Sequence, residues 1–254
     1  MTAELLARAA ARTTAVVRAV APGQLTHRTP CHDFDVRALL NHLMWVVALA
    51  EPAARKLRLP EDGSVSSERD YVQGDWRASF AERMDAVTAA WAEPDAWTGT
   101  TTFAGGELPA RLAGELVLVD LVVHGWDLAR ATAQDYGCDG DVADAVYRVV
   151  SDMAEMGRSM GLFADPVEVP DNAGALARAL GLAGRDPRWA PPTVPPTVPP
   201  TAPGAAPRGV TARGAPARTE DVTTAEATSP RTLTKHLPSA PGERQPAPDM
   251  RPPP

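Results

Sequence analysis

The fold of this chain is decided by the stretch Glu115-Leu-Val-Leu-Val-Asp-Leu-Val-Val-His-Gly-Trp-Asp-Leu-Ala129. It is apolar almost all round, which is the pattern of a buried helix. Two polar residues, Asp120 and His124, lie inside it four positions apart, so on a helix they project from the same face. A carboxylate in such a helix is costly unless it meets a cation or good hydrogen-bond donors. We therefore expect a positive partner close to Asp120.

Composition divides the chain into two parts. Seventeen of the 26 prolines follow Trp189, and no Phe, Trp or Tyr does. The part before this residue is long enough to bury a substantial core. The part after it begins with Pro-Pro-Thr-Val repeats and has too little apolar material to pack. We predict a globular domain over 1–189 and a disordered Pro/Ala/Thr-rich tail over 190–254, partly in the polyproline II conformation.

Charge and hydropathy exclude several classes of protein. The net charge of −7 argues against sequence-independent nucleic-acid binding, which needs a basic surface. No apolar run approaches the ~18–20 residues that span a bilayer, and the N-terminus lacks the plan of a signal peptide. Cys31 and Cys138 form no CxxC pair, so neither a disulfide scaffold nor a zinc ribbon is indicated. We expect a cytoplasmic protein that binds neither nucleic acid nor membrane; whether it forms a homodimer is left open.

Apolar residues recur at helical spacing in six segments. The predicted helices are 3–21, 36–57, 75–91, 109–133, 141–160 and 172–182. Asp35 is a candidate N-cap for the second helix, and Gly125 inside the fourth implies close packing or a nearby ligand. Thr-rich residues 97–103, followed by Ala-Gly-Gly-Glu, favour a short β-hairpin. The predicted fold class is all-α, a four-helix bundle with short extra helices and a small hairpin.

His42, Asp120 and His124 are the candidate metal ligands. His42 lies at the edge of the apolar face of the second predicted helix, so it can reach across to a facing helix. Two neutral imidazoles and a carboxylate commonly hold Zn²⁺, Ni²⁺ or Fe²⁺ with positions left open. We take Zn²⁺ as the first choice, with Ni²⁺ and Fe²⁺ as alternatives. The competing interpretation is a hydrogen-bonded network without metal, because an Asp and a His four residues apart often form only a hydrogen bond.

Three further residues have two interpretations each. Cys31 precedes a helix, whose dipole lowers a thiol pKa, yet free cysteines are most often packed in the core. Asp127 lies two turns after Asp120 and either orients a ligand histidine or pairs with Arg130 or Arg37. His32 lies in a polar loop, either at the surface or at the mouth of the site.

Two segments resemble a known superfamily. Thr29-Pro-Cys-His-Asp-Phe-Asp-Val-Arg-Ala-Leu-Leu-Asn-His-Leu43 resembles the entry to the second helix of the DinB-like, mycothiol-dependent maleylpyruvate isomerase N-terminal superfamily. Leu118-Val-Asp-Leu-Val-Val-His-Gly-Trp-Asp-Leu-Ala-Arg-Ala131 resembles its metal-bearing helix. With residues 163–170 and 180–189, they are more closely similar to an actinobacterial-type subfamily of metal-binding proteins.

The resemblance implies a DinB-like bundle in which His42, Asp120 and His124 hold a divalent metal. The isomerase has Glu at the position of Asp120, and the shorter side chain changes the reach of the carboxylate. The isomerase also has a C-terminal domain that contributes to its activity, where this chain has the Pro-rich tail. Maleylpyruvate isomerisation itself is therefore not expected to carry over.

Three functional hypotheses follow. The first is a metal-dependent transferase or isomerase that presents a small-molecule thiol, mycothiol by the resemblance, to a small electrophilic substrate. The second is a non-catalytic metal-binding or ligand-sensing bundle. The third is a structural bundle in which His42, Asp120 and His124, here called the trio, form a closed hydrogen-bonded network.

Overall fold

Helices make up most of the structure, a computed structural model that describes residues 3–59 and 64–191. The helices in these ranges are α1 (Ala3–Ala19), α2 (Val36–Ala54), α3 (Trp76–Ala92), α4 (Ala110–Ala131), α5 (Gly140–Ser159) and α6 (Ala175–Leu182), with short 3-10 turns at Pro22–Gln24 and Pro94–Trp97. Each predicted helix is present, with ends shifted by a few residues. The predicted all-α fold class is confirmed.

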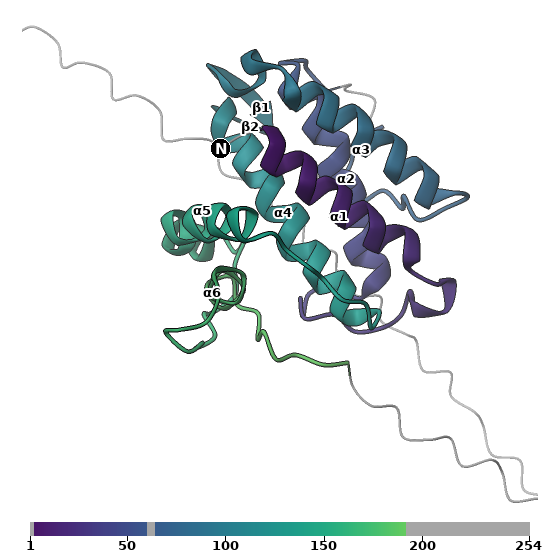
Figure 1. The fold of residues 1–254 in the computed structure, drawn as a ribbon. Helices are drawn as coiled ribbons and strands as arrows, with labels where there is room; N and C mark the ends of the chain where they lie inside the picture. Colours follow the sequence, from purple (N-terminus) through teal and green to yellow (C-terminus); the bar gives the residue numbers. More distant parts are fainter. Residues whose placement is uncertain (1–2, 60–63, 192–254) are drawn as a thin grey trace, which may run out of the picture. The chain divides into compact units, whose positions relative to one another are not determined.

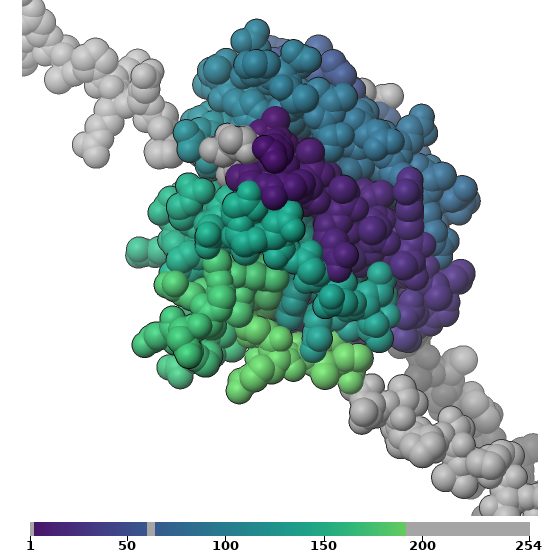
Figure 2. Space-filling view, in the orientation of Figure 1, coloured from purple at the N-terminus to yellow at the C-terminus, as the bar shows by residue number. Residues whose placement is uncertain are grey.

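Four of the helices form the bundle. α1 and α2 each pack against both α3 and α4. α5 and α6 lie together on the side of α4 that faces away from α3 (Figure 1). In the space-filling view, the green residues that precede residue 191 form a continuous layer with the teal residues of α5 (Figure 2). The extra helices therefore add a second layer beside the bundle, next to α4.

The segment that decides the fold is the middle of α4, and it is buried as expected. Val117, Leu118, Leu121 and Val122 are fully inaccessible to solvent. Because this helix contacts α1, α2 and α5, apolar residues all round it find apolar neighbours.

Helix α2 begins where the sequence predicted. The Asp35 side chain accepts a hydrogen bond of 2.8 Å from the backbone N–H of Ala38, which is the geometry of an N-cap. The cap fixes the start of the helix and hence the side of it on which His42 lies.

Gly125 is required by close packing. A Cβ atom there would lie 2.6 Å from Oγ1 of Thr13 and 2.9 Å from the ring of Tyr136. The Thr13 hydroxyl also donates to the carbonyl of Leu121 at 2.7 Å, so α1 and α4 approach closely here. Of the two interpretations of this glycine, the structure supports packing.

The predicted hairpin is present as β1 (Thr100–Phe103) and β2 (Gly106–Pro109), an antiparallel pair. Ala104 and Gly105 form a two-residue turn with φ angles of 48° and 85°, as a type I′ turn requires. The Thr101 hydroxyl donates to the carbonyl of Ala53 at 2.7 Å, which joins the hairpin to the end of α2.

The predicted tail, 190–254, lies outside the described residues except for Ala190 and Pro191, which are both exposed. Its disorder stays a prediction. Within the ranges that the structure covers, no helix combines the length and apolar character needed to cross a membrane.

Candidate metal centre

The three predicted ligands meet between α2 and α4. Nε2 of His42 lies 3.5 Å from Oδ1 of Asp120, and Nε2 of His124 lies 3.6 Å from the same oxygen. One ligand atom from each residue lies within 4.8 Å of the others. Residues 78 positions apart in sequence therefore present their donor atoms to one point.

These distances fit a shared cation better than a closed hydrogen-bonded network. They exceed the ~2.7–3.2 Å of a well-formed N–H···O hydrogen bond. Ligand atoms ~2.0–2.2 Å from a tetrahedral ion lie about 3.3–3.6 Å apart, which is the spacing of both His–Asp pairs. In addition, Nε2 of His42 is buried and has no hydrogen-bond partner among the described residues. A divalent cation would satisfy this nitrogen and balance Asp120.

A small ligand can reach the trio. The side chains of His42 and Asp120 are 23% and 26% exposed, whereas that of His124 is 11% exposed. Two aromatic residues adjoin the opening: Phe34 stacks on His42 at 5.3 Å between ring centroids, and Trp45 lies 5.9 Å from the same ring. Phe34 was not singled out in the sequence, because one aromatic residue before a helix has no distinguishing pattern.

The electrostatic environment favours the protonation states in which Asp120 and His124 can bind a metal ion. Desolvation by itself raises the pKa of Asp120, but the interactions of its carboxylate with His42, His124 and Arg185 outweigh it, and the pKa lies below its usual value. Burial lowers the pKa of His124, although its bond to Asp127 opposes the shift. The carboxylate is therefore ionised and the imidazole neutral, as metal binding requires.

The second nitrogen of His124 is bound to a buried carboxylate. Nδ1 lies 3.0 Å from Oδ2 of Asp127, a residue with no solvent exposure. Nε and Nη2 of Arg185 lie 3.4 and 3.3 Å from the same oxygen. The interpretation of Asp127 as the partner of a ligand histidine is thus supported.

The alternative pairings of Asp127 are wrong. Arg130 donates to the carbonyl of Trp189, and Arg37 pairs with Asp70. The actual partner, Arg185, is 58 residues away and was missed. The only signal in the sequence was that a buried Asp127 needs a cation from somewhere.

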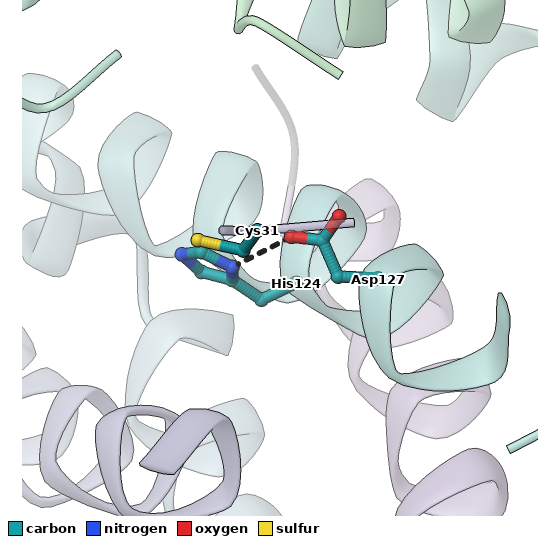
Figure 3. A group of neighbouring side chains, drawn as sticks. All are labelled: Cys31, His124 and Asp127. Atoms are coloured by element: carbon teal, nitrogen blue, oxygen red, sulfur yellow. Dashed lines mark hydrogen bonds and ion pairs between the residues drawn. The ribbon is translucent and has the colours of Figure 1, made fainter. Parts of the chain in front are cut away.

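Cys31, His124 and Asp127 form a second group whose potential ligand atoms lie close together (Figure 3). Asp127 already has the charge of Arg185 and the proton of His124 as partners. Burial raises the pKa of the Cys31 thiol to about 11, so the thiol is neutral near pH 7. The interpretation of Cys31 as a thiol with a lowered pKa is therefore wrong, because burial outweighs the helix dipole. We interpret Cys31 as a packed cysteine.

His32 is exposed, and its Nε2 lies 3.9 Å from Oδ1 of Asp33.

The fold and the site define a helical bundle with a His-Asp-His candidate metal centre between two of its helices. Residues 6–129 match the family model described as the mycothiol maleylpyruvate isomerase N-terminal domain. This match includes all three residues of the trio and confirms the resemblance at the level of the superfamily. The narrower similarity to a subfamily of metal-binding proteins stays a prediction.

Two curated proteins of Mycobacterium tuberculosis are distant relatives. They are "Uncharacterized protein MT0763" of strain CDC 1551 / Oshkosh and "Uncharacterized protein Rv0738" of strain ATCC 25618 / H37Rv. Each is 27% identical over 137 residues, an alignment that covers 51% of this chain and 66% of the relative. The chain thus spans just under two thirds of the length of these relatives. No solved structure matches it.

Proposed function

We propose that His42, Asp120 and His124 bind one divalent metal ion, with Zn²⁺ as the first choice. We further propose that the protein is a transferase or isomerase that uses a small-molecule thiol of the mycothiol type on a small electrophile. The observation that carries the metal site is that one ligand atom from each of the three residues lies close to the other two. One of these atoms, the buried Nε2 of His42, has no hydrogen-bond partner among the described residues. The thiol chemistry rests on the similarity of residues 6–129 to the isomerase domain.

The residues of the site have separate roles in this proposal. Two neutral imidazoles leave the charge of a bound divalent cation at +2, and the carboxylate of Asp120 reduces it by one. When bound, such an ion lowers the pKa of a coordinated thiol. Phe34 and Trp45 provide apolar surface beside the opening, against which the carbon skeleton of a substrate can pack. Asp127 fixes the orientation of His124.

A non-catalytic metal-binding or ligand-sensing bundle is the second candidate. It is favoured because the three donor atoms are sufficient by themselves to hold a metal ion. The thiol chemistry of the first candidate rests in addition on the similarity of residues 6–129 to the isomerase domain.

Metal analysis tests the site. Protein purified without a histidine tag is expected to hold about one equivalent of divalent metal, and His42→Ala much less than that. His32→Ala is the matched control, because this exposed histidine is outside the trio. Less than about a tenth of an equivalent in the wild type, even after reconstitution, would exclude the metal site.

A thiol-conjugation assay separates the two candidates. Wild type and His124→Ala are compared with mycothiol and a panel of small electrophiles. Activity in the wild type that is lost in the variant supports the enzyme. Equal rates in both proteins, or no rate above the uncatalysed reaction in a metal-loaded wild type, would exclude the enzyme and favour the non-catalytic bundle.

A further inference from the structure

Arg185 is a buried cation outside the region that matches the family. Only 6% of its surface is exposed, and it follows α6, well beyond residue 129, where the match ends. Arginine is rarely buried unless it is paired, because removing the charge from water is costly. Its partner is Asp127, which is completely buried on α4. A charged pair therefore links the end of α6 to the helix that carries two of the three proposed ligands.

The end of α6 places Arg185 with local precision. Gly184 has a φ of 82°, its N–H donates to the carbonyl of Gly181, and the N–H of Arg185 donates to that of Leu180. This is the Schellman ending of a helix, which needs a residue with positive φ at this position. Nη1 of Arg185 also donates to the carbonyl of Ala183 at 2.6 Å. The guanidinium is thus held on its own helix end while two of its nitrogens face Asp127.

A chain of polar contacts connects the side chains of Arg185, Asp127 and His124. Nε and Nη2 of Arg185 contact Oδ2 of Asp127, and this oxygen lies 3.0 Å from Nδ1 of His124. The other nitrogen of this imidazole, Nε2, is the atom that faces Asp120. We propose that Arg185 is a positioning residue for the metal centre: it holds Asp127 as the acceptor for Nδ1–H of His124, so that Nε2 presents its lone pair to the metal.

The hydrogen bond to Asp127 determines which nitrogen of His124 can bind a metal ion. A neutral imidazole has a single N–H, and a hydrogen bond from Nδ1–H leaves Nε2 as the acceptor. Carboxylate partners of this kind fix the tautomer and ring orientation of metal-binding histidines. Without Arg185, Oδ2 of Asp127 would lose two donors and keep only the hydrogen bond of His124. The other carboxylate oxygen, Oδ1, has no hydrogen-bond partner among the described residues that could hold the group in place. The metal part of this inference rests on the proposed function, whereas the tautomer part does not.

A purely structural role for Arg185 makes a different prediction. Arg130 also anchors the residues after α6, because its Nε donates to the carbonyl of Trp189 at 3.0 Å. Both of the guanidinium nitrogens that form these hydrogen bonds donate to Trp189 and not to Asp127. Arg130→Ala therefore loosens the same segment without changing the partner of His124. It is the matched control for Arg185→Met.

The first measurement is the tautomer of His124 in metal-free, full-length protein, read from its ¹⁵N chemical shifts and ring couplings. Wild type and Arg130→Ala are expected to show the Nδ1–H form, and Arg185→Met a mixture with the Nε2–H form. An Nε2–H tautomer in the wild type would overturn the inference. So would an unchanged tautomer in Arg185→Met. Because no metal is present, failure of the proposed metal site does not affect this result.

The second measurement is a Co²⁺ titration followed by the visible absorption of the bound ion. Arg185→Met is expected to bind Co²⁺ about tenfold more weakly than the wild type, with an altered spectrum, since outer partners of metal-binding histidines contribute about 10–100-fold in affinity. Arg130→Ala should stay within about twofold. Equal losses in both variants, or none in either, would overturn the positioning role. Should Arg185→Met not fold, Arg185→Lys takes its place, with a smaller loss of the same kind expected. A wild type that binds no Co²⁺ contradicts the proposed function, while the tautomer still decides the role of Arg185.

Discussion

Oδ2 of Asp127 accepts a hydrogen bond from Nδ1 of His124 at 3.0 Å, and both residues lie on α4, three positions apart. The carboxylate has no exposure to solvent, so its orientation is set by protein groups alone. His124 is therefore fixed from behind by one carboxylate while its Nε2 faces another, Asp120. The two carboxylates have different environments, and we expect different consequences when each is changed.

Asp127→Asn should damage both stability and metal binding. Removing one partner of a buried ion pair leaves the charge of Arg185 uncompensated, which costs about 3–5 kcal/mol. Metal affinity should fall about 10–100-fold, because the imidazole loses its charged acceptor. Urea unfolding and Co²⁺ titration measure the two effects. Asp152→Asn, at an exposed position of α5, is the control and should change neither.

His42→Ala should separate metal binding from stability. Nε2 of His42 makes no hydrogen bond with the described residues, so the metal-free protein should lose only about 1 kcal/mol or less in its free energy of unfolding. Metal affinity should fall more than about 100-fold, which exceeds the usual effect of an outer partner. Unfolding in the presence of a chelator gives the first quantity. A large loss of stability in the metal-free variant would show that the trio is a structural network.

Cys31 should react slowly with thiol reagents in the folded protein. Burial raises the pKa of its thiol to about 11 and has the same effect at Cys138. At pH 8 about one thiol in a thousand is then ionised, against about a quarter for an ordinary thiol with a pKa of about 8.5. The rate of reaction with an aromatic disulfide, in native buffer and in guanidinium, measures this difference. Fast modification of native Cys31 near pH 7 would restore the reactive-thiol interpretation.

Gly184→Ala should weaken metal binding through the end of α6. A left-handed conformation costs a non-glycine residue about 1–2 kcal/mol, and the new Cβ would lie 2.6 Å from Cβ of Ala164. The helix ending that positions Arg185 must therefore shift. We expect lower stability together with weaker Co²⁺ binding.

Gly140→Ala is the control for this change. A Cβ there meets no atom within 4 Å, and its φ is not positive. Thermal unfolding and Co²⁺ titration should show no loss in this variant. Unchanged Co²⁺ affinity in Gly184→Ala would mean that the position of Arg185 does not depend on the helix ending.

Local sequence was sufficient for the elements and for the relative placement of two of the three proposed ligands. Helical spacing places Asp120 and His124 on one face of α4 whatever the rest of the chain does, because a helix repeats every 3.6 residues. The same reasoning places Asp35 at the start of α2, since a side-chain acceptor satisfies the first free N–H groups of a helix. These conclusions depend on neighbours within a few positions. They could be reached without any knowledge of packing.

Only the tertiary structure decided how charges on different elements are paired. The sequence suggested Arg130 and Arg37 as partners of Asp127, whereas the structure pairs it with Arg185. The residues that follow α6 reach α4, and the two other arginines bind elsewhere. The structure likewise decided between the two interpretations of Cys31 in favour of the packed cysteine, because burial of the thiol outweighs the local helix dipole. Periodicity determines which face of a helix is apolar. Which cation comes to lie against a buried carboxylate depends on contacts between residues far apart in the chain.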